Sequence, residues 1–309
     1  MLLDAASVWS KAWPILFAIL FFGVIILIHE LGHFTVAKLS GIKVNEFAIG
    51  MGPKLLSFGK GETKYSLRLI PMGGYVQMEG EDEASEDERA FNQKPVWKRF
   101  LVVIAGAVMN IILGLVLVAI LLTQQNLIGT TQIAGFHENA SSQSSGLQEG
   151  DVITHINGTS VWSDRDISFL MARDRDGVID FTVKRDGQKT ELKNVKFDTR
   201  EVDGQTVITF DFIIIGENKT FWNVLKTSFL ETASMARLVW LSLFDLVTGR
   251  FGLSDLAGPV GTVSVIAEAT TSGGFLNALS LMAFITINIG VFNLLPIPGL
   301  DGGRLFFLI

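Results

Sequence analysis

Four hydrophobic segments alternate with polar regions along this chain, and they predict its long helices. They cover residues 13–37, 100–122, 221–247 and 275–295. About 20 apolar residues in helical conformation cross a bilayer core of about 30 Å, so the first, second and fourth segments are predicted to span a membrane. The third segment contains four charged residues: Lys226, Glu231, Arg237 and Asp245. These charges favour an amphipathic helix at the membrane surface, and a further span is the alternative.

The region between the first two predicted spans has the pattern of β-strands. Over residues 42–80 apolar and polar residues alternate, and glycines mark the turns. This alternation is typical of half-buried strands, so we expect two to four short strands beside the membrane. The acidic stretch EGEDEASEDERA follows at residues 79–90 and is interpreted as a solvated loop.

A second polar region, residues 128–215, has the pattern of a small domain of strands and one helix. Its stretch GLQEGDVITHINGTSV predicts a turn, a strand and a tight Asn157–Gly158 turn. The stretch RDISFLMARD predicts a helix, and residues 178–197 predict a hairpin that turns at Asp186–Gly187. The first stretch resembles a PDZ domain, a module that binds extended peptides at the edge of a sheet, and a generic small β-domain is the alternative.

Basic residues are distributed unevenly between the two polar regions, and this predicts the orientation of the chain. Ten Lys and Arg residues lie between residues 38 and 99, and the next basic residue is Arg165. Because cytoplasmic loops carry the excess of basic residues, residues 38–99 are predicted in the cytoplasm and residues 123–220 outside. The fourth segment should then end at the cytoplasmic side. The formal net charge of −6 argues against a nucleic-acid partner.

The motif HELGH at residues 29–33 stands at the end of the first apolar segment, where ionisable side chains are costly. His29 and His33 are four residues apart, so a helix presents both imidazoles on one face. Two imidazoles at this spacing bind one zinc ion, and Glu30 then faces the water as a general base. Because the chain has no Cys, a further ligand must come from His, Asp or Glu.

The third ligand is predicted in NLLPIPGLDGG, residues 293–303, at the end of the fourth segment. Pro296 and Pro298 break the helix and free backbone carbonyls, which is tolerated at membrane depth only beside protein or a water-filled cavity. Asp301 follows this break at the same predicted depth as the HELGH motif, and we therefore predict that it completes the zinc site. Gly302–Gly303 are expected to let the backbone pass close to another helix.

With both motifs in place, the chain resembles the site-2 protease family of intramembrane zinc metalloproteases, and in particular its bacterial branch with a single PDZ insert. A third feature of that family, Gly-x-x-x-Asn in the second span, matches Gly106 and Asn110. The resemblance implies that the two histidines and Asp301 bind zinc and that Glu30 is the catalytic base. It also implies that Gly106 and Asn110 contact the substrate.

The same resemblance assigns further residues to the substrate site. Asn293 would line the active site and hold either the substrate backbone or the oxyanion. Residues 43–78 are similar to a membrane re-entrant β-element that presents an edge strand to the substrate. Within this element Gly50, Met51 and Gly52 are expected to contact the substrate.

The expected fold class is a polytopic α-helical membrane protein with a membrane-associated β-hairpin or β-sheet element and an inserted extracytoplasmic PDZ-like α+β domain. Its expected parts are the first span (1–38), the re-entrant loop (39–98), the second span (99–124), the PDZ domain (125–216), an amphipathic segment (217–274) and the span with the second motif (275–309). Family members continue through a further helix after this motif, so we interpret the chain as truncated before its last helix.

The expected function is hydrolysis of peptide bonds within or near transmembrane segments, with Zn²⁺ as the cofactor, in a bacterial plasma membrane. The resemblance implies transmembrane substrates that another protease has already shortened, such as anti-sigma factors or signal-peptide remnants. Membrane lipid and a peptide C-terminus at the PDZ domain are the other expected partners. The alternative is a catalytically inert PDZ-bearing membrane scaffold, and a metal transporter is disfavoured because the chain shows no internal repeat.

Overall fold

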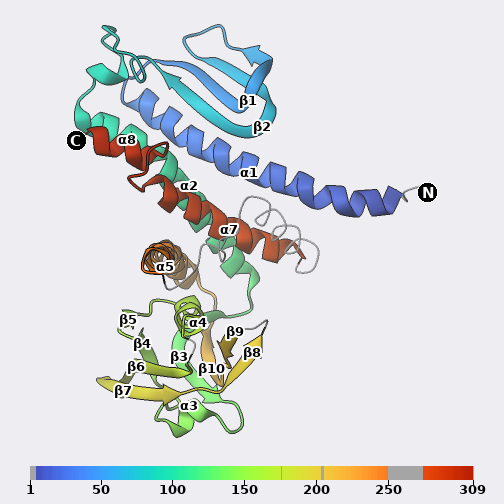
Figure 1. The fold of residues 1–309 in the computed structure, drawn as a ribbon, viewed down its shortest axis with the longest axis vertical. Helices are drawn as coiled ribbons and strands as arrows, with labels where there is room; N and C mark the ends of the chain where they lie inside the picture. The colour runs from blue at the N-terminus through green and yellow to red at the C-terminus, as the bar shows by residue number, and fades with distance from the viewer. Residues whose placement is uncertain (1–4, 175, 203–204, 250–273, 309) are drawn as a thin grey trace. The chain divides into compact units, whose positions relative to one another are not determined.

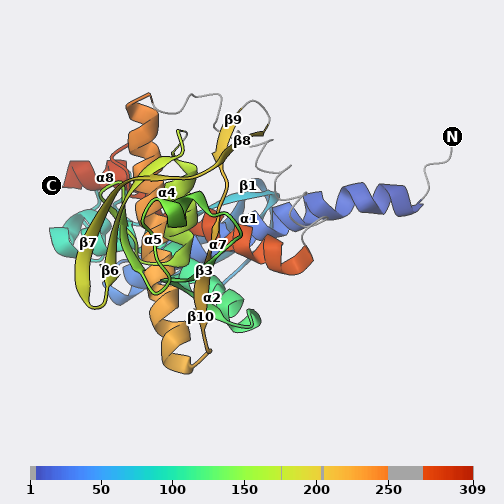
Figure 2. The same ribbon diagram turned by 90° about the horizontal axis from the view of Figure 1, so that it is seen from below.

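The structure, a computed structural model, describes residues 5–174, 176–202, 205–249 and 274–308. It divides into two compact units, one of Met1–Val118 with Met235–Ile309 and one of Ala119–Ser234. The first unit contains the apolar helices and a bent β-hairpin, and the second contains a six-stranded sheet. Figures 1 and 2 show these elements in two views.

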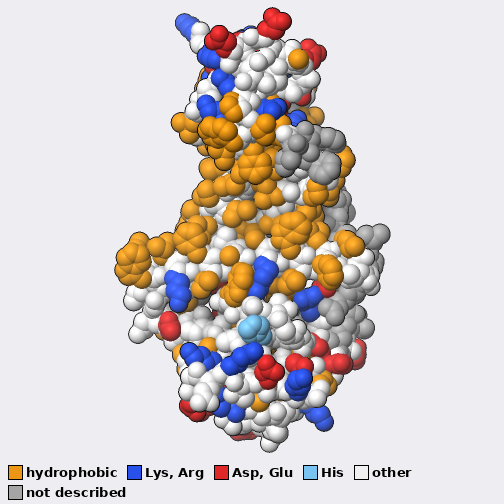
Figure 3. Space-filling model, turned by 90° about the vertical axis from the view of Figure 1, so that its left-hand side faces the viewer, with side chains coloured by type: hydrophobic (Ala, Val, Ile, Leu, Met, Phe, Trp, Pro, Cys, Tyr) orange, Lys and Arg blue, Asp and Glu red, His pale blue; other side chains and the backbone are white. Residues whose placement is uncertain are grey.

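Four helices of the first unit form on the apolar segments and on the second motif: α1 (Ala5–Leu39), α2 (Val96–Gln124), α7 (Gly274–Asn293) and α8 (Asp301–Leu308). In the described part of the chain, three stretches are long and apolar enough to cross a membrane: Leu16–Leu39, Val96–Gln124 and Gly274–Asn293. They coincide with the three predicted spans, and we conclude that this is a membrane protein. The space-filling view shows a continuous area of exposed hydrophobic side chains, as expected for a surface that faces lipid (Figure 3).

The third hydrophobic segment forms the helix α5 (Phe221–Val247), as expected, and it is not among the candidate spans of the described residues. Its charged residues keep its hydropathy below that of the other long helices. Residues 250–273 of the predicted amphipathic segment lie outside the described residues.

The helices α1, α2 and α7 pack closely because small residues let their backbones approach one another. A side chain at Gly32 of α1 would collide with the Ala105 carbonyl of α2. Between α2 and α7, the Thr286 hydroxyl donates a hydrogen bond to the Asn110 carbonyl at 3.2 Å, and both residues are completely buried. The rotation of α2 about its axis is therefore fixed by its two neighbours.

The β-element consists of two long strands, β1 (Val44–Phe58) and β2 (Lys64–Met78), rather than the two to four short strands that we expected. The glycines that suggested turns instead bend the strands while the pairing continues. Gly50, Gly52 and Gly73 have φ angles of 85°, 81° and 84°, a left-handed conformation that glycine adopts without strain.

The bends allow the first half of β1 to lie between both halves of β2. Residues 46–49 have Cα partners in residues 64–67 and again in residues 74–77. Residues 74–78 therefore form an edge of this sheet, with one neighbouring strand among the described residues. The hairpin lies beside the C-terminal end of α1 (Figure 1), where Phe47 and Val76 share a buried cluster with Ala37 of α1 and Val102 of α2.

A buried acidic residue strengthens the hairpin. Glu46 accepts hydrogen bonds from Lys54 Nζ at 3.0 Å and from an Arg68 amino group at 3.1 Å. Burial alone would raise the pKa of Glu46, but its hydrogen bonds outweigh burial and lower the pKa to about 2. The carboxylate therefore stays charged down to acidic pH and ties β1 to β2.

The second unit is built on an antiparallel sheet with the strand order β10-β3-β4-β6-β7, and β5 pairs with β4. A separate hairpin, β8–β9, precedes β10. The strands are β3 (Ile128–Phe136), β4 (Val152–Ile156), β5 (Thr159–Ser160), β6 (Val178–Arg185), β7 (Gln188–Lys196), β8 (Thr199–Val202), β9 (Gln205–Ile208) and β10 (Phe212–Glu217). Two short helices belong to this unit, α3 (Ser141–Ser144) and α4 (Asp164–Ala172). The first unit contains one further short element, the 3₁₀ turn η1 (Phe91–Gln93).

Local sequence signals explain much of this unit. The Asn157–Gly158 and Asp186–Gly187 pairs both adopt positive φ angles, so both predicted turns are confirmed. The helix predicted from RDISFLMARD is α4, which begins with a capping box formed by Ser163 and Asp166. The PDZ assignment and the expected domain boundaries stay predictions.

Candidate metal centre

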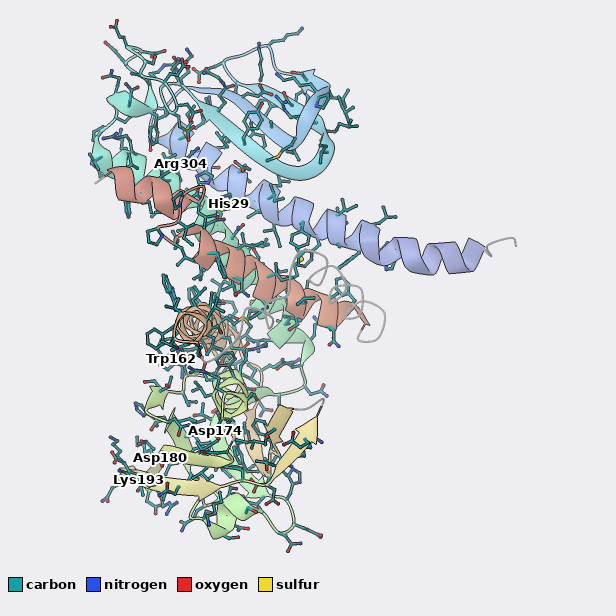
Figure 4. All side chains as sticks on the ribbon, viewed as in Figure 1. His29, Trp162, Asp174, Asp180, Lys193 and Arg304 are labelled. Atoms are coloured by element: carbon teal, nitrogen blue, oxygen red, sulfur yellow. The ribbon has the colours of Figure 1, made fainter. Side chains whose placement is uncertain are left out.

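Two histidines of α1 form the first part of the site. Because they are four residues apart, His29 and His33 project from the same face of the helix. Their Nε2 atoms lie 3.1 Å apart. Figure 4 shows His29 on α1 close to α8, on which Arg304 is labelled.

The second motif brings an aspartate to these histidines. The helix α7 ends at Asn293, the turn around Pro296 and Pro298 follows, and α8 begins at Asp301. Asp301 Oδ2 lies 3.2 Å from His29 Nε2 and 3.3 Å from His33 Nε2. Residues that are far apart in the sequence thus place three potential ligand atoms around one point.

The glycines after the aspartate have a different role from the one that we expected. A side chain at Gly302 would overlap the backbone of Leu294 and Leu295, and one at Gly303 would overlap the backbone of Ile297 and Pro298. They therefore let α8 fold back onto the preceding turn, rather than onto another helix. This tight return is what orients Asp301 toward α1.

The three atoms fit a zinc ion in spacing and in chemistry. Tetrahedral zinc holds nitrogen and oxygen ligands at about 2.0–2.1 Å, which places neighbouring ligand atoms about 3.3 Å apart. The observed triangle has sides of 3.1, 3.2 and 3.3 Å. Asp301 Oδ2 is buried and faces the two imidazole Nε2 atoms, so a cation between the three atoms would pair with all of them at once.

The proton positions of one histidine also suit a metal. His33 Nδ1 lies 2.8 Å from the Val102 carbonyl of α2, and a carbonyl can only accept a hydrogen bond. In neutral His33 the ring proton is therefore on Nδ1, which leaves a lone pair on Nε2. This lone pair points at His29 Nε2 and Asp301 Oδ2.

Gly106 and Asn110 of α2 lie next to the two histidines. A side chain at Gly106 would overlap His33 Nε2 and would come within 2.7 Å of two atoms of the His29 ring. Asn110 is completely buried, and its Nδ2 is 3.3 Å from His29 Nδ1. Neither residue lines the cavity beside the metal centre, and substrate contact by them stays a prediction.

A cavity of about 630 Å³ opens beside the three ligand atoms. Glu30 lines it together with the two histidines and Asp301. The strand segment 74–78 and Arg304 of α8 form other parts of its wall. The cavity therefore gives a reacting molecule access to the ligand atoms and to a carboxylate that is not part of the triangle.

The other predicted substrate residues take different places. Met51 lines the cavity. Gly50 and Gly52 form the bend of β1, where a side chain at Gly50 would meet the Ile70 carbonyl. Asn293 is half-buried at the end of α7 and is not among the residues that line the cavity.

Sequence reasoning missed several residues of the cavity wall. The backbone of Gly74 packs against Glu30, since a side chain there would meet Glu30 Cγ at 2.9 Å. Arg304 forms an ion pair with Glu81, which also lines the cavity. The sequence did indicate one of these residues. Arg304 is three residues after Asp301, and residues three apart lie near each other on one face of a helix such as α8.

Two imidazoles, a carboxylate, a free glutamate and an adjoining cavity, all on a membrane protein, define a metal-dependent hydrolase. The comparison with known families agrees: the model of peptidase family M50 matches residues 17–309, and this chain belongs to that family. The protein is therefore a zinc metalloendopeptidase of the site-2 type, and its cofactor is zinc.

The relatives support the same class. A protein of Clostridium acetobutylicum named "Putative zinc metalloprotease" is 42% identical, and the match covers 96% of this chain and 86% of that protein. A protein of Clostridium perfringens with the same description is 38% identical over 94% of this chain and 86% of its own length. The regulator of sigma-W protease RasP of Bacillus subtilis is 30% identical over 94% and 88%.

Proposed function

We propose that this protein cleaves membrane proteins within or next to their transmembrane segments, after another protease has shortened them. The proposal rests on the position of two proposed ligands in the chain. His29 and His33 lie within the candidate membrane span Leu16–Leu39. A soluble protease would not need its metal site on a helix of this hydropathy, where ionisable groups are costly. The intact ligand set also makes an inert scaffold the weaker reading.

The residues of the cavity divide the chemistry between them. His29, His33 and Asp301 would hold zinc, which when bound would supply Lewis acidity for the scissile carbonyl and for the attacking water. Glu30 accepts the proton of that water and delivers it to the nitrogen of the leaving amine. Asn293 is proposed to contact the substrate backbone or the oxyanion from the end of α7.

The chemistry of cleavage supports a locally unwound substrate. A helical substrate hides the carbonyl that must be attacked, because the carbonyl is already hydrogen-bonded. The substrate is therefore expected to enter as a short extended stretch, and helix-breaking residues near its cleavage site should speed cleavage.

The edge of the hairpin offers this stretch a partner. Residues 74–78 line the cavity and belong to the edge segment of β2, whose backbone is available for another strand. Pairing with this edge would replace hydrogen bonds that the substrate loses when it unwinds. Met51, in the bend that Gly50 and Gly52 create, is then placed to contact substrate side chains.

The two polar regions of the chain are expected on opposite sides of the membrane. The basic residues between 38 and 99 support a cytoplasmic β-element, and the second unit is then on the opposite side of the membrane. The turns and capped helix of residues 125–216 support a PDZ domain, which would bind the new C-terminus of a shortened substrate. Anti-sigma factors and signal-peptide remnants are substrates of this kind.

The experiment compares Glu30→Gln with the wild-type protein in membranes that contain a single-span model substrate. Glu30→Gln should keep its zinc and lose cleavage by about 10²–10⁴-fold, the usual contribution of a general base. Glu83→Gln is the matched control, since Glu83 is exposed and does not line the cavity. Cleavage by Glu30→Gln at the wild-type rate would refute the assignment of the base. Cleavage of soluble peptides alone would refute an intramembrane protease.

A further inference from the structure

The completely buried amide of Asn110 lies at the nitrogen of His29 that faces away from the metal centre. Its Nδ2 is 3.3 Å from His29 Nδ1, and its Oδ1 has no hydrogen-bond partner among the described residues. A side-chain amide can turn by 180°, which exchanges the positions of its oxygen and its nitrogen. The two orientations of this amide have opposite consequences for His29.

With Nδ2 toward the ring, the amide donates to Nδ1, so the proton of neutral His29 must be on Nε2. That proton would then point at His33 Nε2, 3.1 Å away, and at Asp301 Oδ2, 3.2 Å away. With Oδ1 toward the ring, the amide accepts a proton from Nδ1, and Nε2 carries a lone pair. The second orientation pairs the amide oxygen with the Nδ1 proton and leaves a His29 nitrogen that can bind a metal, which the first orientation does not.

His33 provides an internal comparison. The Val102 carbonyl, which can only accept, already places the ring proton of His33 on Nδ1. Val102 and Asn110 are eight residues apart on α2, with Gly106 midway, so all three lie on one face of that helix. The same face of α2 can thus supply an acceptor to each histidine, one from its backbone and one from a side chain.

We infer that Asn110 is a positioning residue of the zinc centre, whose amide oxygen accepts the Nδ1 proton of His29 and so keeps the Nε2 lone pair directed at the metal. The inference rests on the proposed zinc protease, and it gives Asn110 a role behind the ligand instead of a contact with substrate. Partners of this kind orient a histidine and raise its basicity, and their loss commonly lowers metal affinity by about 10–100-fold.

The test is the zinc affinity of detergent-purified full-length protein, measured by competition with a chelator, together with the absorption spectrum of the Co²⁺-substituted protein. Asn110→Leu keeps the number of side-chain heavy atoms and removes the acceptor, so zinc affinity should fall about 10–100-fold and the Co²⁺ bands should change. Asn110→Asp restores an acceptor and should bind zinc clearly more tightly than Asn110→Leu. If the leucine variant does not fold, Asn110→Ala takes its place.

The matched control is Thr286→Val. Thr286 contacts the same residue, but through the Asn110 carbonyl, and it is equally buried. Its replacement disturbs the α2–α7 contact without touching His29, so zinc affinity should stay at the wild-type value.

Three results would overturn the inference. They are wild-type zinc affinity in Asn110→Leu, an equal loss in Asn110→Leu and Asn110→Asp, and a loss in Thr286→Val as large as that in Asn110→Leu. The second would mean that the amide donates to His29, and the third that only helix packing matters. A wild-type protein that binds no zinc would instead refute the proposed protease itself, so the two failures can be told apart.

Discussion

Gly106 provides the sharpest test of how the metal centre is built. In the structure this residue of α2 faces both histidines, and no atom of a larger side chain fits there. Gly106→Ala adds a single methyl group and leaves the three proposed ligands, the proposed base Glu30 and the charge of the protein unchanged. Any loss of zinc must therefore come from displacement of the imidazoles.

The size of the displacement follows from the contacts. A methyl carbon at residue 106 would lie 2.7 Å from both Cε1 and Nε2 of His29, and it would overlap His33 Nε2 as well. Non-bonded carbon atoms prefer separations of about 3.5–4.0 Å, so the rings or α2 must move by about 1 Å. Metal ligands tolerate errors of only about 0.2 Å, and a 1 Å misplacement at a catalytic centre costs about 10²-fold in rate.

We therefore expect Gly106→Ala to lose zinc affinity and at least about 10²-fold in cleavage rate, measured on the same purified samples by chelator competition and with the model substrate. Gly23→Ala is the matched control, because Gly23 is also a helical glycine of the first unit and has nothing within 4 Å of an added methyl group. Wild-type zinc affinity and cleavage in Gly106→Ala would show that α2 does not press against the histidines, and the described geometry would be refuted.

Three further outcomes follow from the structure. Asp301→Ala should lower the zinc content found by elemental analysis, whereas Asp82→Ala, which changes another acidic residue of the cavity wall, should leave it unchanged. Asp151→Asn breaks a buried ion pair with Arg185 and should destabilise the second unit by about 3 kcal/mol, seen as faster hydrogen exchange of residues 119–234. The pKa of Glu46 is about 2 in the folded protein, whereas an unfolded Glu titrates at about 4.3. The carboxylate therefore stabilises the hairpin fully above about pH 4.3, and this stabilisation is lost as the pH falls toward 2. Hydrogen exchange of the hairpin should accelerate over this range.

Local rules are sufficient to predict the candidate ligands. The spacing of His29 and His33 follows from the period of a helix, and the prolines and glycines around Asp301 mark the place where the fourth segment must turn. The structure brings these three residues together within 3.3 Å. Hydrophobic length alone likewise predicts the three helices that can cross a membrane.

Features that depend on how elements meet could not be predicted in the same way. Gly302 and Gly303 indicate close packing, but only the fold shows that their neighbour is the preceding turn. The glycines of the β-element suggest strand ends, whereas cross-strand pairing carries β1 and β2 through Gly50 and Gly73. A glycine permits a turn and a bend equally, and the choice between them depends on partners that are distant in sequence.

The helix α2 shows why the metal centre needs more than its ligands. It supplies no ligand, yet Val102, Gly106 and Asn110 follow one another at intervals of four residues along the face that meets α1. The Val102 carbonyl meets His33, Gly106 makes room for both rings, and Asn110 meets His29. A one-residue insertion between residues 106 and 110 would rotate this face by about 100°, which would remove the Asn110 contact while keeping every ligand. The second span therefore supports the proposed metal centre through its contacts with both histidines.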